Sequence, residues 1–180
     1  MKRIALLAAL VLALPVVGAV HATADSGSRN YQYLIGVDPL CSIEPTACPA
    51  ISRASNGDTI EVTGSGTLSI HPKSVTGQGT FVHKDPSGTP RASGTWTALA
   101  LRSFVSYGNE PDLPPELEGG SAVILVQLLV DGAPVATATL KVDCEIGQPP
   151  PGHGEGIRLA VRGVANFNKK VQGLTVFIRQ

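Results

Sequence analysis

The feature that most limits the fold of this chain is an alternation of apolar and polar residues with a period of two, from Thr59 onward. Residues 135–144, VATATLKVDC, place Ala, Ala, Leu, Val and Cys on one face of an extended strand. Residues 157–162, IRLAVR, alternate in the same way, and residues 123–130, VILVQLLV, are apolar on both faces, as expected for a covered central strand. β-Branched residues dominate and no convincing amphipathic helix is present, so the sequence predicts strands.

Turn-forming residues separate these runs, at 56–58, 71–74, 85–88, 131–132 and 166–168. Strands joined by short turns predict an all-β domain, an antiparallel meander of roughly 7–9 strands that closes as a barrel or folds as a sandwich. We expect residues 59–180 to form this domain, with residues 25–58 contributing an N-terminal strand and a cysteine-containing loop to the same domain.

The N-terminus predicts export. Lys2 and Arg3 precede an apolar run over residues 4–20, and Ala22-Thr23-Ala24 follows, which is the pattern of a secretory signal peptide over residues 1–24. A membrane anchor is the alternative, but the apolar run is at the lower length limit for a span. We therefore expect cleavage before Asp25, no membrane span afterwards, and a secreted or periplasmic protein.

Charge and aromatic content exclude some partners. Without Lys2 and Arg3 the 14 basic residues fall to 12 against 14 acidic ones, and nucleic-acid binders instead concentrate positive charge. The chain contains eight aromatic residues (four Phe, three Tyr and one Trp), few for a platform that stacks bases or sugars. We expect no nucleic acid, and a small molecule or a protein surface as the partner.

The three cysteines agree with an oxidising compartment. Cys41 and Cys48 lie in a proline-rich loop, DPLCSIEPTACPA, and their spacing favours a local disulfide bond. No histidine is near enough in the sequence to complete a metal knuckle with them. Cys144 ends an apolar strand, so we expect it to be a buried, unreactive thiol.

A glycine pattern occurs three times, as TGSGTL (63–68), TGQGTF (76–81) and SGTW (93–96). A phosphate-binding loop would need a following helix or a Lys-Ser/Thr pair, and neither is present. The intervals instead match one strand plus one turn, which favours glycines that let a sheet curve. If residues 85–90 join two paired strands symmetrically, Phe81 lies opposite Gly94 and Trp96 lies opposite Gly79.

Recognisable catalytic machinery is missing from the sequence. It contains no nucleophile elbow, no zinc-protease helix, no kinase signature, no EF-hand loop and no cofactor motif, so we expect no cofactor. Two function classes stay open. The first is a non-enzymatic secreted module that binds a ligand or serves a structural role. The second is a small barrel enzyme, such as an isomerase, a cyclase or a hydrolase, that acts on a small ligand in a cavity.

The most suggestive group of polar residues is expected at one end of the sheet, because alternate connections of a meander share an end. The turn at 71–74 and the loops at 107–120 and 145–156 meet there by this reasoning, while Lys170 falls at the opposite end. His83 is expected to be a solvated strand end. Carboxylates and imidazoles on such loops could bind a cation or a ligand. The candidate residues are His71, Glu110, Asp112, Glu116, Glu118, His153 and Glu155.

Overall fold

The computed structural model describes residues 29–180, and almost every element in this range is an extended strand. The predicted signal peptide therefore lies outside the described residues. The elements are β1 (Asn30–Ile35), the 3-10 helix η1 (Leu40–Ser42), β2 (Ala50–Ala54), β3 (Thr59–Ser69), β4 (Ser74–Lys84), β5 (Pro90–Gly108), β6 (Leu117–Val130), β7 (Ala133–Cys144), β8 (Gly156–Val161), β9 (Ala165–Gln172) and β10 (Thr175–Arg179). Within this range η1 is the only helix, with 3 residues, and no helix there is long and apolar enough to cross a membrane.

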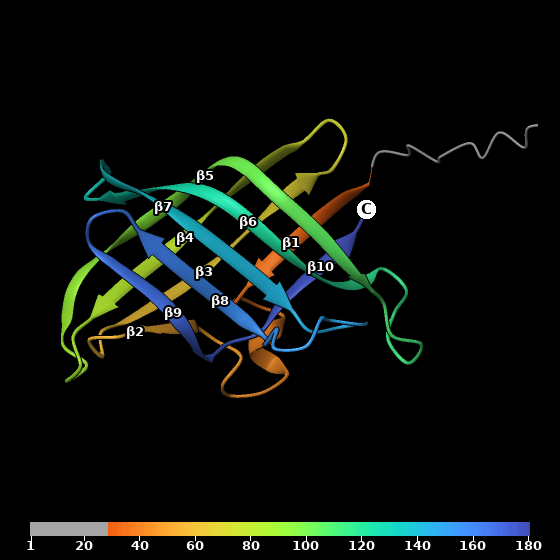
Figure 1. The fold of residues 1–180 in the computed structure, drawn as a ribbon, viewed down its shortest axis with the longest axis horizontal. Coiled ribbons are helices and arrows are strands. Elements are labelled where there is room, and N and C mark those ends of the chain that lie inside the picture. The colour runs from red at the N-terminus through yellow and green to blue at the C-terminus, as the bar shows by residue number, and fades with distance from the viewer. Residues whose placement is uncertain (1–28) are drawn as a thin grey trace, which may run out of the picture.

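Strands β2 to β9 form a closed antiparallel barrel. Each strand pairs with the next along the chain, and β9 returns to pair with β2, so that the ring is complete. In Figure 1 strands β6 to β8 cross in front of β3 and β4 at a steep angle, as the twist of a closed sheet requires. The predicted all-β class and antiparallel meander are confirmed.

Strands β1 and β10 bring the number of strands in the described part of the chain to ten, and they close the sheet a second time at one end of the molecule. β1 pairs with β10 and with the second half of β3, while β10 pairs with the first residues of β6. At this end the path of paired strands runs from β3 through β1 and β10 to β6. It continues through β7, β8, β9 and β2 and returns to β3. The two terminal strands thus bind each other in the folded chain.

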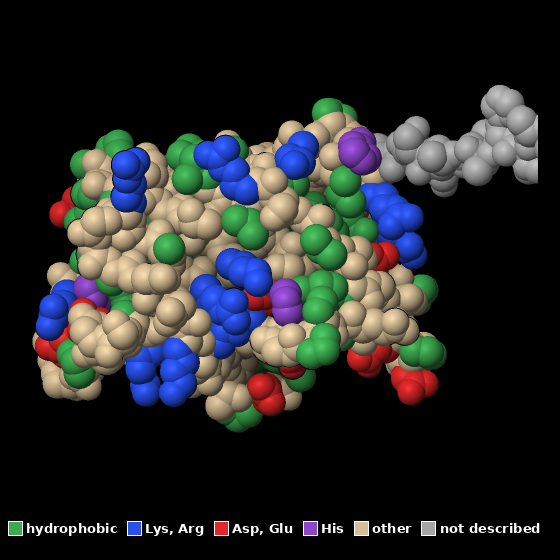
Figure 2. Space-filling model, in the orientation of Figure 1, with side chains coloured by type: hydrophobic (Ala, Val, Ile, Leu, Met, Phe, Trp, Pro, Cys, Tyr) green, Lys and Arg blue, Asp and Glu red, His purple; other side chains and the backbone are tan. Residues whose placement is uncertain are grey.

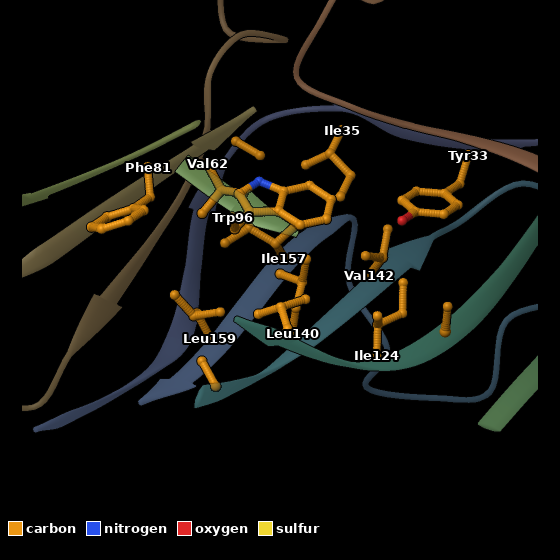
Figure 3. Packing of buried hydrophobic residues seen from close by; sticks show 14 of the residues in the cluster. Tyr33, Ile35, Val62, Phe81, Trp96, Ile124, Leu140, Val142, Ile157 and Leu159 are labelled. Atoms are coloured by element: carbon orange, nitrogen blue, oxygen red, sulfur yellow. The ribbon is translucent and has the colours of Figure 1, made fainter. Parts of the chain in front are cut away.

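Aromatic and aliphatic side chains from opposite walls fill the interior of the barrel. Tyr33 from β1 and Trp96 from β5 are almost completely buried. Figure 3 shows both rings lying over aliphatic side chains, among them Leu140 and Val142 of β7 and Ile157 of β8. The alternation seen in the sequence is the cause, because every second residue of these strands points inward.

The glycine pattern is structural, as expected. Gly79 pairs with Trp96 and Gly94 pairs with Phe81, which is the predicted register. Gly64 also lies directly opposite Gly79 across β3 and β4, and the indole of Trp96 covers this bare pair. The Trp96 Nε1–H donates a hydrogen bond to the Thr63 carbonyl at 2.9 Å. The missing side chains therefore make room for a ring that closes the core.

The cysteine predictions are confirmed. Cys41 and Cys48 form a disulfide bond, and Cys144 is a buried free thiol whose pKa is raised to about 12 by burial. The bridged loop carries η1 and packs on the outer side of β1 and β10, where Leu40 contacts a small second core. The Leu174 N–H donates to the Ala47 carbonyl at 2.9 Å and fixes the loop to the end of the barrel. The disulfide bond between Cys41 and Cys48 is consistent with an oxidising environment.

Candidate functional site

A cavity of about 200 Å³ opens at the mouth of the barrel where β3, β5, β7 and β9 begin. Nearly all of its wall is apolar, because the inward-facing positions at these strand ends carry aliphatic and aromatic side chains. A small cavity with such a wall and few polar groups is the usual form of a ligand site. The lining residues are Ile60, Phe81, His83, Ala92, Leu128, Val130, Val135, Ala136, Val161, Val164 and Phe167.

One imidazole, that of His83, supplies the polar wall of this cavity. Its Nε2 lies 2.9 Å from Oδ2 of Asp58, which is 3% exposed in the turn before β3. The hydrogen bond with His83 holds the pKa of Asp58 below its usual value, although burial acts to raise it, and Arg91 at 3.6 Å adds a favourable charge. Asn56 holds the turn by accepting a hydrogen bond from the Asp58 N–H at 3.1 Å. Asp58 is thus a charged, fixed partner for the ring.

Two atoms of this pair retain unused hydrogen-bonding capacity. A charged carboxylate at Nε2 places the proton of the neutral imidazole on that nitrogen, which leaves Nδ1 as an acceptor. Nδ1 of His83 has no hydrogen-bond partner among residues 29–180, and Oδ1 of Asp58 is buried without one. The ring itself is fixed by an edge-to-face contact with Phe167 at 5.3 Å. An oriented imidazole with a free acceptor can bind a donor or remove a proton.

The expectation for His83 was wrong. Its side chain is only 15% exposed and is paired, whereas a solvated strand end had been predicted. The register of β3 and β4 explains the difference, because Ile60 lies opposite His83 and both face the interior. Asp58 is two residues before Ile60 and therefore lies on the same face, diagonal to the ring. Residues 70–73 form the turn, one position earlier than the predicted 71–74, and this turn sets the observed register of β3 and β4.

At the opposite end of the barrel, the connection between β7 and β8 carries His153 and Glu155. The His153 Nδ1 lies 2.6 Å from the hydroxyl oxygen of Tyr107. Glu155 accepts hydrogen bonds from the N–H and hydroxyl of Thr175 at 2.7 and 2.8 Å, and from the Glu145 N–H at 2.8 Å. Burial raises the pKa of Glu155. Both predicted residues thus fasten their own loop to the barrel.

A buried carboxylate, Asp143, lies beneath this loop on the outer face of β7. Oδ2 of Asp143 lies 2.8 Å from the Lys170 ammonium, and its Oδ1 lies 3.3 Å from that of Lys141 and 4.0 Å from Nδ1 of His153. Burial acts to raise the pKa of Asp143, but Lys170 and Ser121 outweigh it and the pKa is lowered. Figure 2 shows basic side chains around acidic and histidine atoms near the centre of this face. Lys170 and Lys141 thus form ion pairs with the carboxylate, although neither of its buried oxygens has a hydrogen bond of good geometry with a described residue.

Lys170 was expected at the other end of the molecule, and the structure corrects this. The turn between β8 and β9 occupies residues 162–164 rather than 166–168. Lys170 is therefore well inside β9, near the loop end, where its ammonium also donates to the Gly154 carbonyl. Burial lowers the pKa of Lys170 even though Asp143 acts to raise it.

The remaining candidate residues do not join His153 and Glu155. Glu118 belongs to a separate buried group, in which it accepts hydrogen bonds from Tyr31 and Ser106 at 2.9 Å and pairs with Arg179 at 3.2 Å. Within the described range, no group of three or more His, Cys, Asp or Glu residues is arranged to hold a metal ion. The exposed candidates, on connections between strands, are His71, Glu110, Asp112 and Glu116.

Comparison of the chain with protein-family models, with curated protein sequences and with solved structures finds no match. The two ends of the barrel carry the geometry from which a function can be inferred.

Proposed function

We propose that the protein is a binding module that holds a small, largely apolar molecule at the barrel mouth, with His83 as the polar anchor. The observation that carries this proposal is an apolar cavity whose one oriented polar group, Nδ1 of His83, has no partner within residues 29–180. An apolar cavity of about 150 Å³ holds benzene, so one of about 200 Å³ suits a single substituted ring. Phe81 and Phe167 provide aromatic contacts for such a ring.

The free acceptor defines the preferred substituent. In its neutral form the imidazole held by Asp58 accepts a hydrogen bond at Nδ1, so that form favours a hydroxyl or N–H group on the ligand over a carbonyl. A carboxylate is disfavoured, because Asp58 already places a negative charge beside the ring. A phenol-like molecule fits both requirements.

The test is a titration of the protein with p-cresol, toluene and p-toluate, followed by backbone amide NMR. We expect p-cresol to shift the resonances of Val130 and Phe167 and to bind about three- to tenfold more tightly than toluene, since one hydrogen bond contributes about 0.5–1.5 kcal/mol. His83→Phe should abolish this preference, whereas His71→Phe, at an exposed histidine, should retain it. The proposal fails if none of the three compounds shifts the cavity resonances.

An enzymatic role is the second candidate, and the Asp58–His83 contact favours it. A carboxylate that orients an imidazole is a common arrangement for general-base catalysis. The same NMR spectra would also report a chemical step. Conversion of a bound compound to a new one by the wild-type protein, and not by His83→Phe, would assign acid–base chemistry to the pair.

We also propose that the protein is exported. The disulfide between Cys41 and Cys48 supports an oxidising compartment, and the N-terminal pattern over residues 1–24 supports a cleaved signal. We expect the mature chain to begin at Asp25 and to appear in the periplasm or the medium. Intact-mass measurement of each fraction checks this, and a full-length chain confined to the cytoplasm would contradict it.

A further inference from the structure

A second cavity, of about 320 Å³, lies outside the barrel at the loop end, between the disulfide loop, β10 and the β5–β6 connection. It shares no lining residue with the barrel-mouth cavity. Its wall is almost wholly aliphatic and contains no aromatic ring, so it suits a flexible alkyl chain better than a flat ring. The lining residues are Leu34, Pro39, Leu40, Ile43, Leu113, Leu117, Cys144, Ile146, Glu155, Leu174, Thr175, Val176 and Ile178.

The wall of this cavity is preformed. The Cys41–Cys48 disulfide braces the segment that carries Leu40 and Ile43, and the Leu174–Ala47 hydrogen bond fixes that segment to the residue just before β10. Because this wall does not have to be ordered when a ligand binds, little of the binding free energy is lost as conformational entropy. Ile43 is nevertheless 68% exposed at the rim, which leaves apolar surface for an incoming chain to cover.

The rim of the cavity is acidic. Four exposed carboxylates are each the immediate sequence neighbour of a lining residue, and none forms an ion pair with another residue of the described chain. Figure 2 shows acidic and hydrophobic side chains together at the lower right, where Figure 1 places the β5–β6 connection. Arg179 is the basic neighbour of Ile178, but it is paired with Glu118. The four acidic residues are Asp38, Glu44, Asp112 and Glu116.

Glu155 adds one more acceptor. It is among the lining residues, and its carboxylate receives three hydrogen bonds from the protein, whereas a carboxylate can accept about four. One acceptor position on Oε2 is therefore left for a donor from a ligand. Aliphatic walls and an acidic rim favour the same partner, an apolar chain with a positive charge.

We propose that this cavity binds a cationic amphiphile, an alkyl chain that ends in an ammonium group. A chain on the order of ten carbon atoms fits about 320 Å³, by comparison with benzene in a cavity of about 150 Å³. The alkyl chain lies against Leu113, Leu117 and Val176, and the ammonium group contacts the carboxylates of the rim. This site is independent of the barrel mouth, so it does not rest on the function proposed for His83.

Isothermal titration with decylammonium, decanol and decanoate, each below its micelle concentration, tests the proposal. Decylammonium should bind at least about tenfold more tightly than decanoate, a difference of about 1.4 kcal/mol, and added salt should weaken its binding because the rim charges are exposed. Equal affinity for all three compounds, or no binding heat with decylammonium, would overturn the proposal.

Two matched variants locate the site. Ile43→Lys places a positive charge on the rim at an exposed position and should weaken decylammonium binding at least about tenfold. Val105→Lys makes the same change at a residue that is 56% exposed and lines neither cavity, so it should bind as the wild type does. His83→Phe should also bind normally. Unchanged binding by Ile43→Lys would remove the assignment, as would a ligand-free dimer that Ile43→Lys dissociates, because a second copy would then occupy the cavity.

Discussion

Gly79→Ala is expected to lower the free energy of unfolding by about 3 kcal/mol, at the upper end of the range for overpacking. A Cβ at this position would lie 1.9 Å from the Thr63 carbonyl oxygen and 2.6 Å from Nε1 of Trp96. The carbonyl belongs to the paired strand and cannot turn away, so the strands must separate or the indole must leave its place. Urea unfolding followed by Trp96 emission measures the loss directly, because Trp96 is the only tryptophan of the chain.

Gly154→Ala is the matched control. A Cβ there meets nothing closer than 3.9 Å, so its effect should stay within about 0.5 kcal/mol. Equal stability of the two variants would mean that β3 and β4 adjust freely around Gly79. The packing of Trp96 against bare backbone would then contribute little to the core.

The glycine and ring positions could be predicted because they depend on local pattern alone. Alternation determines which residues face inward, and the short turn between β4 and β5 determines the register, so Phe81 and Gly94 could be paired from the sequence. The pairing of β1 with β10 could not be predicted in this way. Tyr31 lies opposite Arg179, almost the full length of the described chain away, and no turn joins the two strands.

The candidate sites were predicted less well, for a related reason. His153 and Glu155 stood out because they lie in a glycine-rich loop, but the sequence could not show that Tyr107 would contact His153 and that Thr175 would donate to Glu155. The Asp58–His83 pair was missed because neither residue is unusual alone. Their contact needs the β3–β4 register together with the knowledge that both face a cavity.

Asp143→Ala is expected to destabilise the fold by about 3–5 kcal/mol, the usual cost of removing one partner of a buried ion pair. The carboxylate is 1% exposed, and the side chain of Lys170, its nearest cation, is 11% exposed. Without Asp143 the ammonium stays buried beside Arg158, whose charge already acts to lower the pKa of Lys170. Thermal and urea unfolding measure the change. Asp112→Ala, at an exposed and unpaired aspartate, is the control and should change stability by less than about 0.5 kcal/mol.

The stabilisation by Asp143 should also depend on pH in a defined direction. Because the folded-state pKa of Asp143 is lowered, the folded chain binds this proton less readily than the unfolded chain. The contribution is therefore complete above the ordinary value of 3.8 and is lost as the pH falls from there through the lowered pKa. The stability difference between wild type and Asp143→Ala should stay constant down to weakly acidic pH and shrink below it.

Asp143→Ala/Lys170→Met should recover part of the stability lost in Asp143→Ala, since it leaves no unpaired ammonium. A double variant no more stable than Asp143→Ala would show that the carboxylate stabilises the fold through Ser121 and Lys141 instead.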